Sequence, residues 1–224
     1  ALFSRGEYLK ASEDEAMAET IAKVLYPEDN HYEGKSLRLK QQYFFVSATM
    51  QSIMRKHIEV YGTAANFHEK NVIQINDTHP TMVIPELIRI LTTQKDIDGS
   101  VMTMQEAAEV VTKTCAYTNH TILAEALETW PLDYLEEVVP QLVPIIRYLD
   151  ENVRARYTDS SVYIIDENDR VHMAHIGHPI MGDNLYHPKP RQFSLPRMAL
   201  HAAYLGFIQP LTQHEIELDL PVPF

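Results

Sequence analysis

The chain has 224 residues, 45% of them hydrophobic, which is enough to bury a core in one or two domains. It carries 31 acidic and 19 basic residues, and the net charge of −12 makes a nucleic acid or an anionic membrane a poor partner. A single cysteine, Cys115, excludes an intramolecular disulfide framework and fits a reducing cytoplasm. No apolar run reaches membrane-spanning length and no signal peptide opens the chain, so we expect a cytoplasmic protein.

The first sixty residues predict two long helices. Ser12 and Glu15 have the spacing of a capping box, and the apolar residues after them predict a helix from about Glu13 to Leu25. The second helix is predicted from about Ser36 to Tyr61, where Gly62 follows. Between the two lies a polar loop that contains Asp29, Asn30 and His31. Loops of this kind are usually only solvated.

The most informative stretch starts with the apolar run Val72–Ile75, which predicts a strand. The polar turn Asn76–Pro80 follows, and apolar residues at helical spacing come directly after it. In an α/β sheet, ligands collect outside the carboxyl ends of strands, where helix N-termini point. Asp77 and His79 would lie there. The alternative is that Asp77 and Thr78 only cap the helix and that His79 is solvated.

The middle of the chain predicts further helices. Thr103 and Glu106 form a second capping box, followed by a helix whose buried face includes Ala107 and Val110 and on which Cys115 would be an inert, buried thiol. Asn119 and His120 are placed on the turn beyond it, with a structural role for His120, because no metal-ligand spacing accompanies it.

Strands return after a further helical region. Pro131 is predicted at the first position of a helix. Val162–Ile165 and Val171–Ile176 flank a polar turn and predict a hairpin or strand pair, with His175 near the end of the second strand. Helices and strands alternate with helix in excess, which favours an α/β layered domain with few strands.

Four motifs in order resemble the α-glucan phosphorylases, the enzymes that act on glycogen, starch and maltodextrin. They are Asn76-Asp77-Thr78-His79-Pro80, Ile84-Pro85-Glu86-Leu87, Ala116-Tyr117-Thr118-Asn119-His120-Thr121 and Glu125-Ala126-Leu127-Glu128-Thr129-Trp130-Pro131. Further similarity extends the resemblance over about residues 5–176, most like the bacterial type. It implies an internal fragment of the family's N-terminal catalytic domain, which has a GT-B type, Rossmann-like fold.

The resemblance also implies a site. Asp77 and His175 match catalytic positions, and Asn30, Asp29, His79 and His175 match positions that contact or gate the sugar. The resemblance favours a functional role for His175 over the more usual one of a lone core histidine in an apolar strand. It implies that Asp77, His79, Asn30 and His175 converge on one cleft at the strand ends.

The family cleaves terminal α-1,4-glucosidic bonds with inorganic phosphate and releases glucose 1-phosphate. Its members use pyridoxal phosphate and are homodimeric. The cofactor's lysine and the residues that bind phosphate lie in a C-terminal domain that these residues do not include. The fragment is therefore expected to be inactive by itself, because the transition state would lose the donors of one domain. The alternative is a non-catalytic carbohydrate-binding or interaction fragment.

The resemblance ends near Ile176, so residues 1–176 are predicted to be family sequence and residues 177–224 a tail of a different kind. Our hypothesis is a nucleotide frameshift just after Ile176. Codons exist for residues 196–201 that read Thr-Asn-Gly-Ile-Thr, a family motif, in another frame, and the coding DNA decides this. The tail is expected to pack poorly and to be cleaved early by proteases, with Leu195, Met198, Leu200 and Leu205 as the apolar residues of a short helix.

The predicted strands are too few for a complete parallel sheet, which is normally covered on both faces. We therefore expect the isolated chain to associate and to bind a hydrophobic dye despite its charge. A compact, dye-negative monomer in sedimentation would contradict this.

Overall fold

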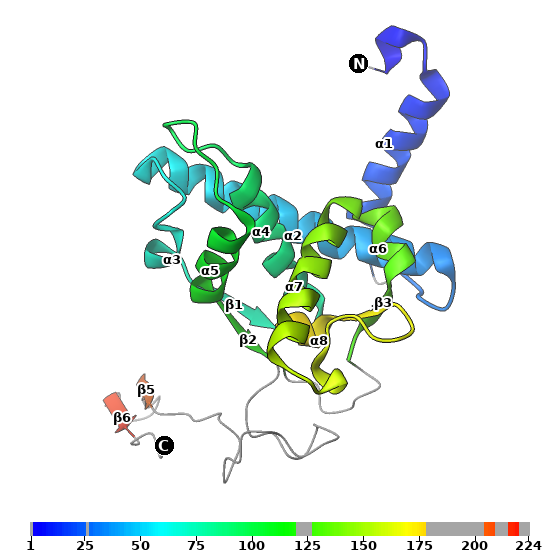
Figure 1. Ribbon diagram of the computed structural model, residues 1–224. Coiled ribbons are helices and arrows are strands. Elements are labelled where there is room, and N and C mark those ends of the chain that lie inside the picture. The colour runs from blue at the N-terminus through cyan, green and yellow to red at the C-terminus, as the bar shows by residue number, and fades with distance from the viewer. Residues whose placement is uncertain (1, 26, 120–126, 178–203, 209–214, 220–224) are drawn as a thin grey trace. The chain divides into compact units, whose positions relative to one another are not determined.

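The computed structural model describes the chain apart from residues 1, 26, 120–126, 178–203, 209–214 and 220–224. The chain divides into two compact units, Ala1–His178 and Pro179–Phe224, each taken by itself below (Figure 1). None of the described helices combines the length and the apolar character that a membrane-spanning helix needs.

The first unit is built mainly of helices. Its α-helices are α1 (Tyr8–Lys23), α2 (Tyr32–Tyr61), α3 (Phe67–Lys70), α4 (Val83–Thr93), α5 (Met104–Thr114), α6 (Leu132–Val138), α7 (Val143–Arg156) and α8 (Met173–Ile176). Single 3-10 turns lie at η1 (Phe3–Arg5), η2 (His79–Met82), η4 (Pro140–Leu142) and η5 (Ser160–Val162). The strands are β1 (Ile73–Asn76), β2 (Cys115–Thr118), β3 (Thr129–Pro131) and β4 (Arg170–His172). The helix-rich α/β fold is the one that the sequence predicts.

The two N-terminal helices are present, but the first begins earlier than predicted. α1 starts at Tyr8, one residue after its N-cap Glu7, so Ser12 lies inside the helix and the predicted capping box there is wrong. The sequence places Ser and Glu at box spacing, but a good helix-forming run precedes them and extends the helix backwards. α2 ends as predicted at Gly62, whose φ of 78° is left-handed and suits a residue without a Cβ.

Two strands of the first unit pair in parallel. β1 pairs with β2 in the register Ile73 with Cys115 through Asn76 with Thr118. α4 and α5 lie beside this pair in Figure 1. The capping box of α5 is confirmed, since Glu106 N donates to Thr103 Oγ1 and Thr103 N donates to Glu106 Oε2. Cys115 is the first residue of β2 and not part of a helix, because pairing with β1 converts the residues after Thr114 into a strand.

The predicted elements around Pro131 and His175 need correction. Trp130 and Pro131 belong to β3, so Pro131 is the N-cap of α6 and not its first helical residue. β3 pairs antiparallel with β4, and Ile165 meets Val171 only in an isolated bridge. The predicted turn is present, but residues 173–176 form α8, which places His175 on a helix. Short apolar runs do not distinguish a strand from a buried helix by periodicity alone.

Two hydrophobic clusters fill the first unit. One gathers residues of α6, η4, α7, β4 and α8, among them Leu135, Leu142 and Ile146. The other gathers residues of α2, α3, β1, α4 and α5, among them Phe67, Leu87 and Leu91. Ile84 of α4 and Leu149 of α7 are partly buried against both clusters, which joins them into one body.

The second unit contains an antiparallel pair of strands, β5 (Tyr204–Ile208) and β6 (Glu215–Asp219). Leu205 lies in β5, so the predicted short helix does not include it. β5 contains Tyr204, Phe207 and Ile208, residue types that favour strands, and this preference outweighs the helical spacing of the leucines. The rest of the predicted poorly packed tail lies outside the described residues.

Candidate functional site

The polar turn after β1 holds two of the predicted site residues. Asp77 takes a left-handed φ of 63°, and its N–H donates to Thr118 O at 2.8 Å, so the end of β2 fixes it. Aspartate tolerates this conformation better than most residues, and its use directly after a strand marks a constrained turn. Thr78 is buried, and His79 opens η2 with an exposed ring. Asp77 and His79 therefore share one rigid turn at the carboxyl end of β1.

The loop between α1 and α2, residues 24–31, reaches this turn through one arginine of α2. Arg38 Nη1 lies 3.0 Å from Asp29 Oδ2, and Arg38 Nη2 lies 2.7 Å from His79 Nε2. The structure thus brings Asp29 and His79 together, although 50 positions separate them in the sequence. Sequence reasoning missed Arg38; the available signal was its place one turn from Gly34 on the face of α2 next to the loop.

The same face of α2 holds the loop at two more points. Gln41 Nε2 donates to Ile21 O at 3.1 Å and to Val24 O at 2.7 Å, where α1 ends. Gly34 lies so close to the loop that a Cβ built on it would be 1.6 Å from Glu28 O. On one face of α2, Gln41 therefore holds the start of the loop, and Gly34 and Arg38 lie against its later residues Glu28 and Asp29.

The other two predicted residues have contacts of a different kind. Asn30 Nδ2 donates to Glu28 Oε1 at 2.9 Å within the loop itself. His175 Nδ1 lies 2.6 Å from Tyr163 O, and its ring stacks on His172 with centroids 4.7 Å apart. Because a carbonyl oxygen only accepts, Nδ1 of His175 carries a proton. α8 packs against η2, so His175 lies on the element next to His79, but these contacts with Tyr163 and His172 tie its ring to the segment that precedes α8.

His172, on which the His175 ring stacks, is itself held by a carboxylate. Its Nε2 lies 2.9 Å from Asp166 Oδ2. Burial by itself would raise the pKa of Asp166, but hydrogen bonds from His172 and from the N–H groups of Arg170 and Asn168 lower it overall. Asp166 therefore stays ionised and organises the turn before β4.

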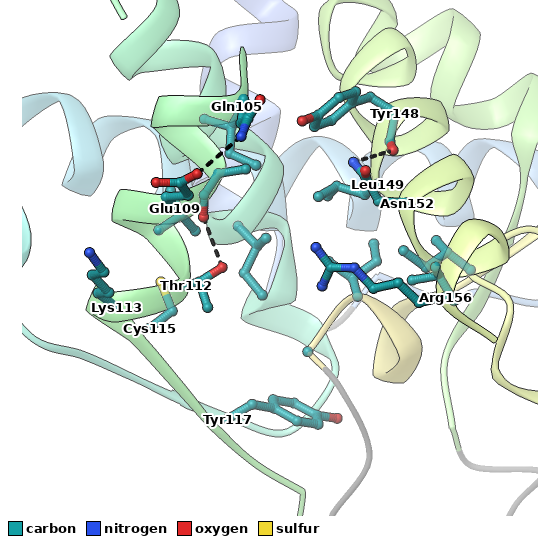
Figure 2. A pocket seen from close by; sticks show the side chains of 18 of the residues that line it. Gln105, Glu109, Thr112, Lys113, Cys115, Tyr117, Tyr148, Leu149, Asn152 and Arg156 are labelled. Carbon is teal, nitrogen blue, oxygen red and sulfur yellow. Dashed lines mark hydrogen bonds between the residues drawn. The ribbon is translucent and has the colours of Figure 1, made fainter. Parts of the chain in front are cut away.

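A groove of about 560 Å³ lies between α5 and α7 (Figure 2). Its apolar floor includes Ile75, Ile88 and Ile176, and Figure 2 shows Gln105 and Glu109 on one side facing Tyr148 and Asn152 on the other. These three side chains are buried, so they do not themselves form the exposed apolar patch on which our expectation of self-association rests.

Tyr117 of β2 connects this groove with the turn. Burial, and then the charge of Asp77, raise the pKa of Tyr117 to about 12, so its phenol stays neutral and Asp77 lies near it. The Tyr117 hydroxyl is buried and has no hydrogen-bond partner among the described residues. Its ring lies over Gly177, where a Cβ would be 2.6 Å from Cγ of the ring.

Cys115 also lines the groove, and burial raises the pKa of its thiol to about 12. Because the thiolate is the reactive form, we expect the native thiol to react with a disulfide reagent at pH 8 roughly a thousandfold more slowly than in denaturant. The measurement is the rate of reagent colour release in buffer and in urea. Equal rates in the two would contradict a buried, inert thiol.

The described lysines do not fit a cofactor attached as a Schiff base. Every one of them outside residues 178–203 is exposed or half-exposed, whereas such a lysine needs an enclosed, partly desolvated site. Over the same part of the chain, no group of three histidine, cysteine, aspartate or glutamate side chains is placed to hold a metal ion.

Comparison with known proteins decides the family. The family model of carbohydrate phosphorylases matches residues 1–182. The chain belongs to this family. It is 52% identical over 160 residues to maltodextrin phosphorylase of Streptococcus pneumoniae, a match that covers 71% of this chain and 20% of that protein. It is 49% identical over 149 residues to glycogen phosphorylase 2 of Dictyostelium discoideum, covering 66% and 14%.

The vertebrate phosphorylases are similar as well. The brain form of glycogen phosphorylase of Homo sapiens is 42% identical over 194 residues, covering 78% of this chain and 22% of that protein. The chain therefore spans about a fifth of the length of the curated phosphorylases it matches. The matched range, 1–182, contains the turn after β1, the α1–α2 loop and α8.

Proposed function

We propose that the chain is a segment of an α-glucan phosphorylase and supplies part of the glucan side of its active site. The reaction is phosphorolysis of terminal α-1,4-glucosidic bonds of glycogen, starch or maltodextrin to give glucose 1-phosphate. The observation that carries the proposal is the cluster in which Arg38 joins Asp29 to His79 at the carboxyl end of β1. The family match supports the reaction class.

Within this proposal, the residues have distinct roles. His79 offers an exposed ring and Asp77 a carboxylate on one rigid turn, and both are suited to hydrogen bonds with sugar hydroxyls. Asp29 and Asn30 lie on the loop beside the turn and would contact or gate the sugar. For His175 we keep the same proposal of a sugar contact, although its contacts with Tyr163 and His172 give it a structural task too.

The rest of the parent protein would complete the reaction. Pyridoxal phosphate is the family's cofactor, and we propose that its lysine lies outside this chain, since the described lysines do not fit it. We further propose that the parent is cytoplasmic and homodimeric. We propose that the fragment alone does not complete the reaction, because it supplies only part of the site and so lacks some of the donors that the transition state requires.

Affinity electrophoresis in a gel that contains glycogen tests the glucan site. We expect the chain to migrate more slowly with glycogen than without, and the variants His79→Ala and Asp77→Ala to lose this retardation. Arg55→Gln, an exposed change on the same helix as Arg38, serves as the matched control and should keep it. Equal retardation of all four proteins would contradict a glucan site at this turn.

A turnover assay tests whether the isolated chain can catalyse the reaction without the rest of the parent protein. With glucose 1-phosphate and maltodextrin as substrates, the isolated chain should release no phosphate. Release by the isolated chain would show that the site is complete in these residues.

A further inference from the structure

Arg38 of α2 lies between Asp29 of the α1–α2 loop and His79 of η2, two residues of the proposed glucan site. One edge of its guanidinium, at Nη1, pairs with Asp29 Oδ2 at 3.0 Å, and Nη2 lies 2.7 Å from His79 Nε2. The Arg38 side chain is 36% exposed, so both contacts lie at the rim and not in the core. A planar group with fixed donor directions couples the positions of the two partners it binds.

The chemistry of the guanidinium fixes the protonation of the histidine. Arginine has only donors and stays charged in proteins, so in the Arg38–His79 contact the nitrogen Nε2 of His79 is the acceptor. An imidazole that accepts at Nε2 carries its proton on Nδ1 and is neutral. His79 then offers an N–H donor at Nδ1 to an oxygen of a bound ligand.

We propose that Arg38 is a positioning residue of the glucan site. It holds His79 as the neutral Nδ1–H tautomer and transmits the position of the α1–α2 loop, through Asp29, to the His79 ring. The inference rests on the proposed glucan site for its purpose, but the coupling itself is a property of these three side chains. Sugar hydroxyls and phosphate oxygens both accept hydrogen bonds, so the class of ligand that fits the Nδ1–H donor is an oxygen-rich one such as a glucan end or a phosphate.

Histidine side-chain NMR of the nitrogen-15 labelled chain at about pH 8 tests the tautomer. Two-bond correlations distinguish a protonated from an accepting ring nitrogen, and the His79 signals are assigned by their loss in His79→Gln. We expect Nδ1–H in the wild type and a shift toward the Nε2–H tautomer, which free imidazole side chains prefer, in Arg38→Gln. Arg38→Lys should shift it too, because a single ammonium cannot bridge both partners. Arg55→Gln is the matched control and should change nothing.

A double-variant comparison tests the coupling. Asp29→Asn should move the ring signals of His79 in the wild-type background and leave them unmoved in the Arg38→Gln background. A His79 ring protonated at Nε2 in the wild type, or His79 signals that do not respond to Arg38→Gln, would overturn the proposal. So would an equal effect of Asp29→Asn in both backgrounds.

Ligand binding by the Arg38 variant tests the positioning role separately from the tautomer of His79. With maltopentaose as ligand, Arg38→Gln should weaken binding by about tenfold, the size expected when a charge-assisted hydrogen bond that positions a ligand contact is lost. If the tautomer responds as expected but neither protein binds maltopentaose, the proposed glucan site fails while the coupling stands. Unchanged binding by Arg38→Gln, with the wild type binding, would refute the positioning role.

Discussion

Replacing Glu86 with glutamine should lower the free energy of unfolding by about 3–5 kcal/mol, the range expected when one partner of a buried ion pair is removed. Glu86 on α4 is fully buried and accepts hydrogen bonds from Ser47 Oγ at 2.7 Å and from Arg89 Nε and Nη2 at 2.7 and 2.8 Å. Tyr43 OH donates to the same carboxylate at 3.2 Å. The cluster therefore joins α2 to α4 through one buried charge.

The physical reason for the loss is the cation that remains. Arginine stays charged in proteins, so Arg89 remains a cation when its partner is neutral. The hydrogen bond to ionised Glu86, which raises the pKa of the Arg89 guanidinium in the wild type, is then weakened. The Arg89 side chain is only 25% exposed, and water replaces the lost anion poorly. Urea unfolding followed by circular dichroism measures the change. Glu59→Gln on the exposed face of α2 is the matched control, and equal midpoints for the two variants would contradict this role of Glu86.

Gly34→Ala should destabilise the protein by about 1–3 kcal/mol, which is opposite in sign to the usual effect of this change inside a helix. Gly34 lies in the first turn of α2, where alanine would normally gain up to about 1 kcal/mol. The new Cβ would lie 1.6 Å from Glu28 O, so either the α1–α2 loop or the start of α2 has to move. Movement of the loop would also separate Asp29 from Arg38.

Two measurements test the effect of Gly34→Ala on stability and on the position of the loop. Urea unfolding gives the stability, and retardation in glycogen gels should weaken together with it. Lys40→Ala, at a half-exposed position of the same helix, controls for general changes in α2 and should keep both stability and retardation. A Gly34→Ala variant that is more stable than the wild type would show that the close approach of Glu28 to α2 is absent in solution.

Local signals in the sequence predicted the parts of the fold that local forces determine. The strand predicted at Val72–Ile75 and found at Ile73–Asn76, the end of α2 at Gly62 and the capping box of α5 follow from an apolar run, a left-handed glycine and a side-chain cap. β2 and α8 could not be predicted in this way. Cys115–Thr118 is a strand because β1 offers it a parallel partner, and residues 173–176 form a helix whose Met173 and Ile176 pack into the cluster around α6 and α7.

Only the part of the site on the turn after β1 was predictable from the spacing of residues in the sequence. The turn that carries Asp77 and His79 follows from the order strand, polar turn and helix, whereas Asp29 and Asn30 came from the family resemblance. Arg38 was not predicted, since its two partners come from a loop nine residues before it and a turn 41 residues after it. No spacing rule links such positions; only the packing of α2 against η2 does.

Residue-resolved NMR of the labelled chain during a titration with maltopentaose tests the glucan site most directly. We predict that the backbone amides of residues 77–79, 81–82 and 28–31 and the side-chain N–H groups of Arg38 shift together with one affinity, while the amides of β5 and β6 stay unchanged. Shifts confined to other parts of the chain, or no saturable shift at the turn after β1, would contradict the assignment of the glucan site to this segment.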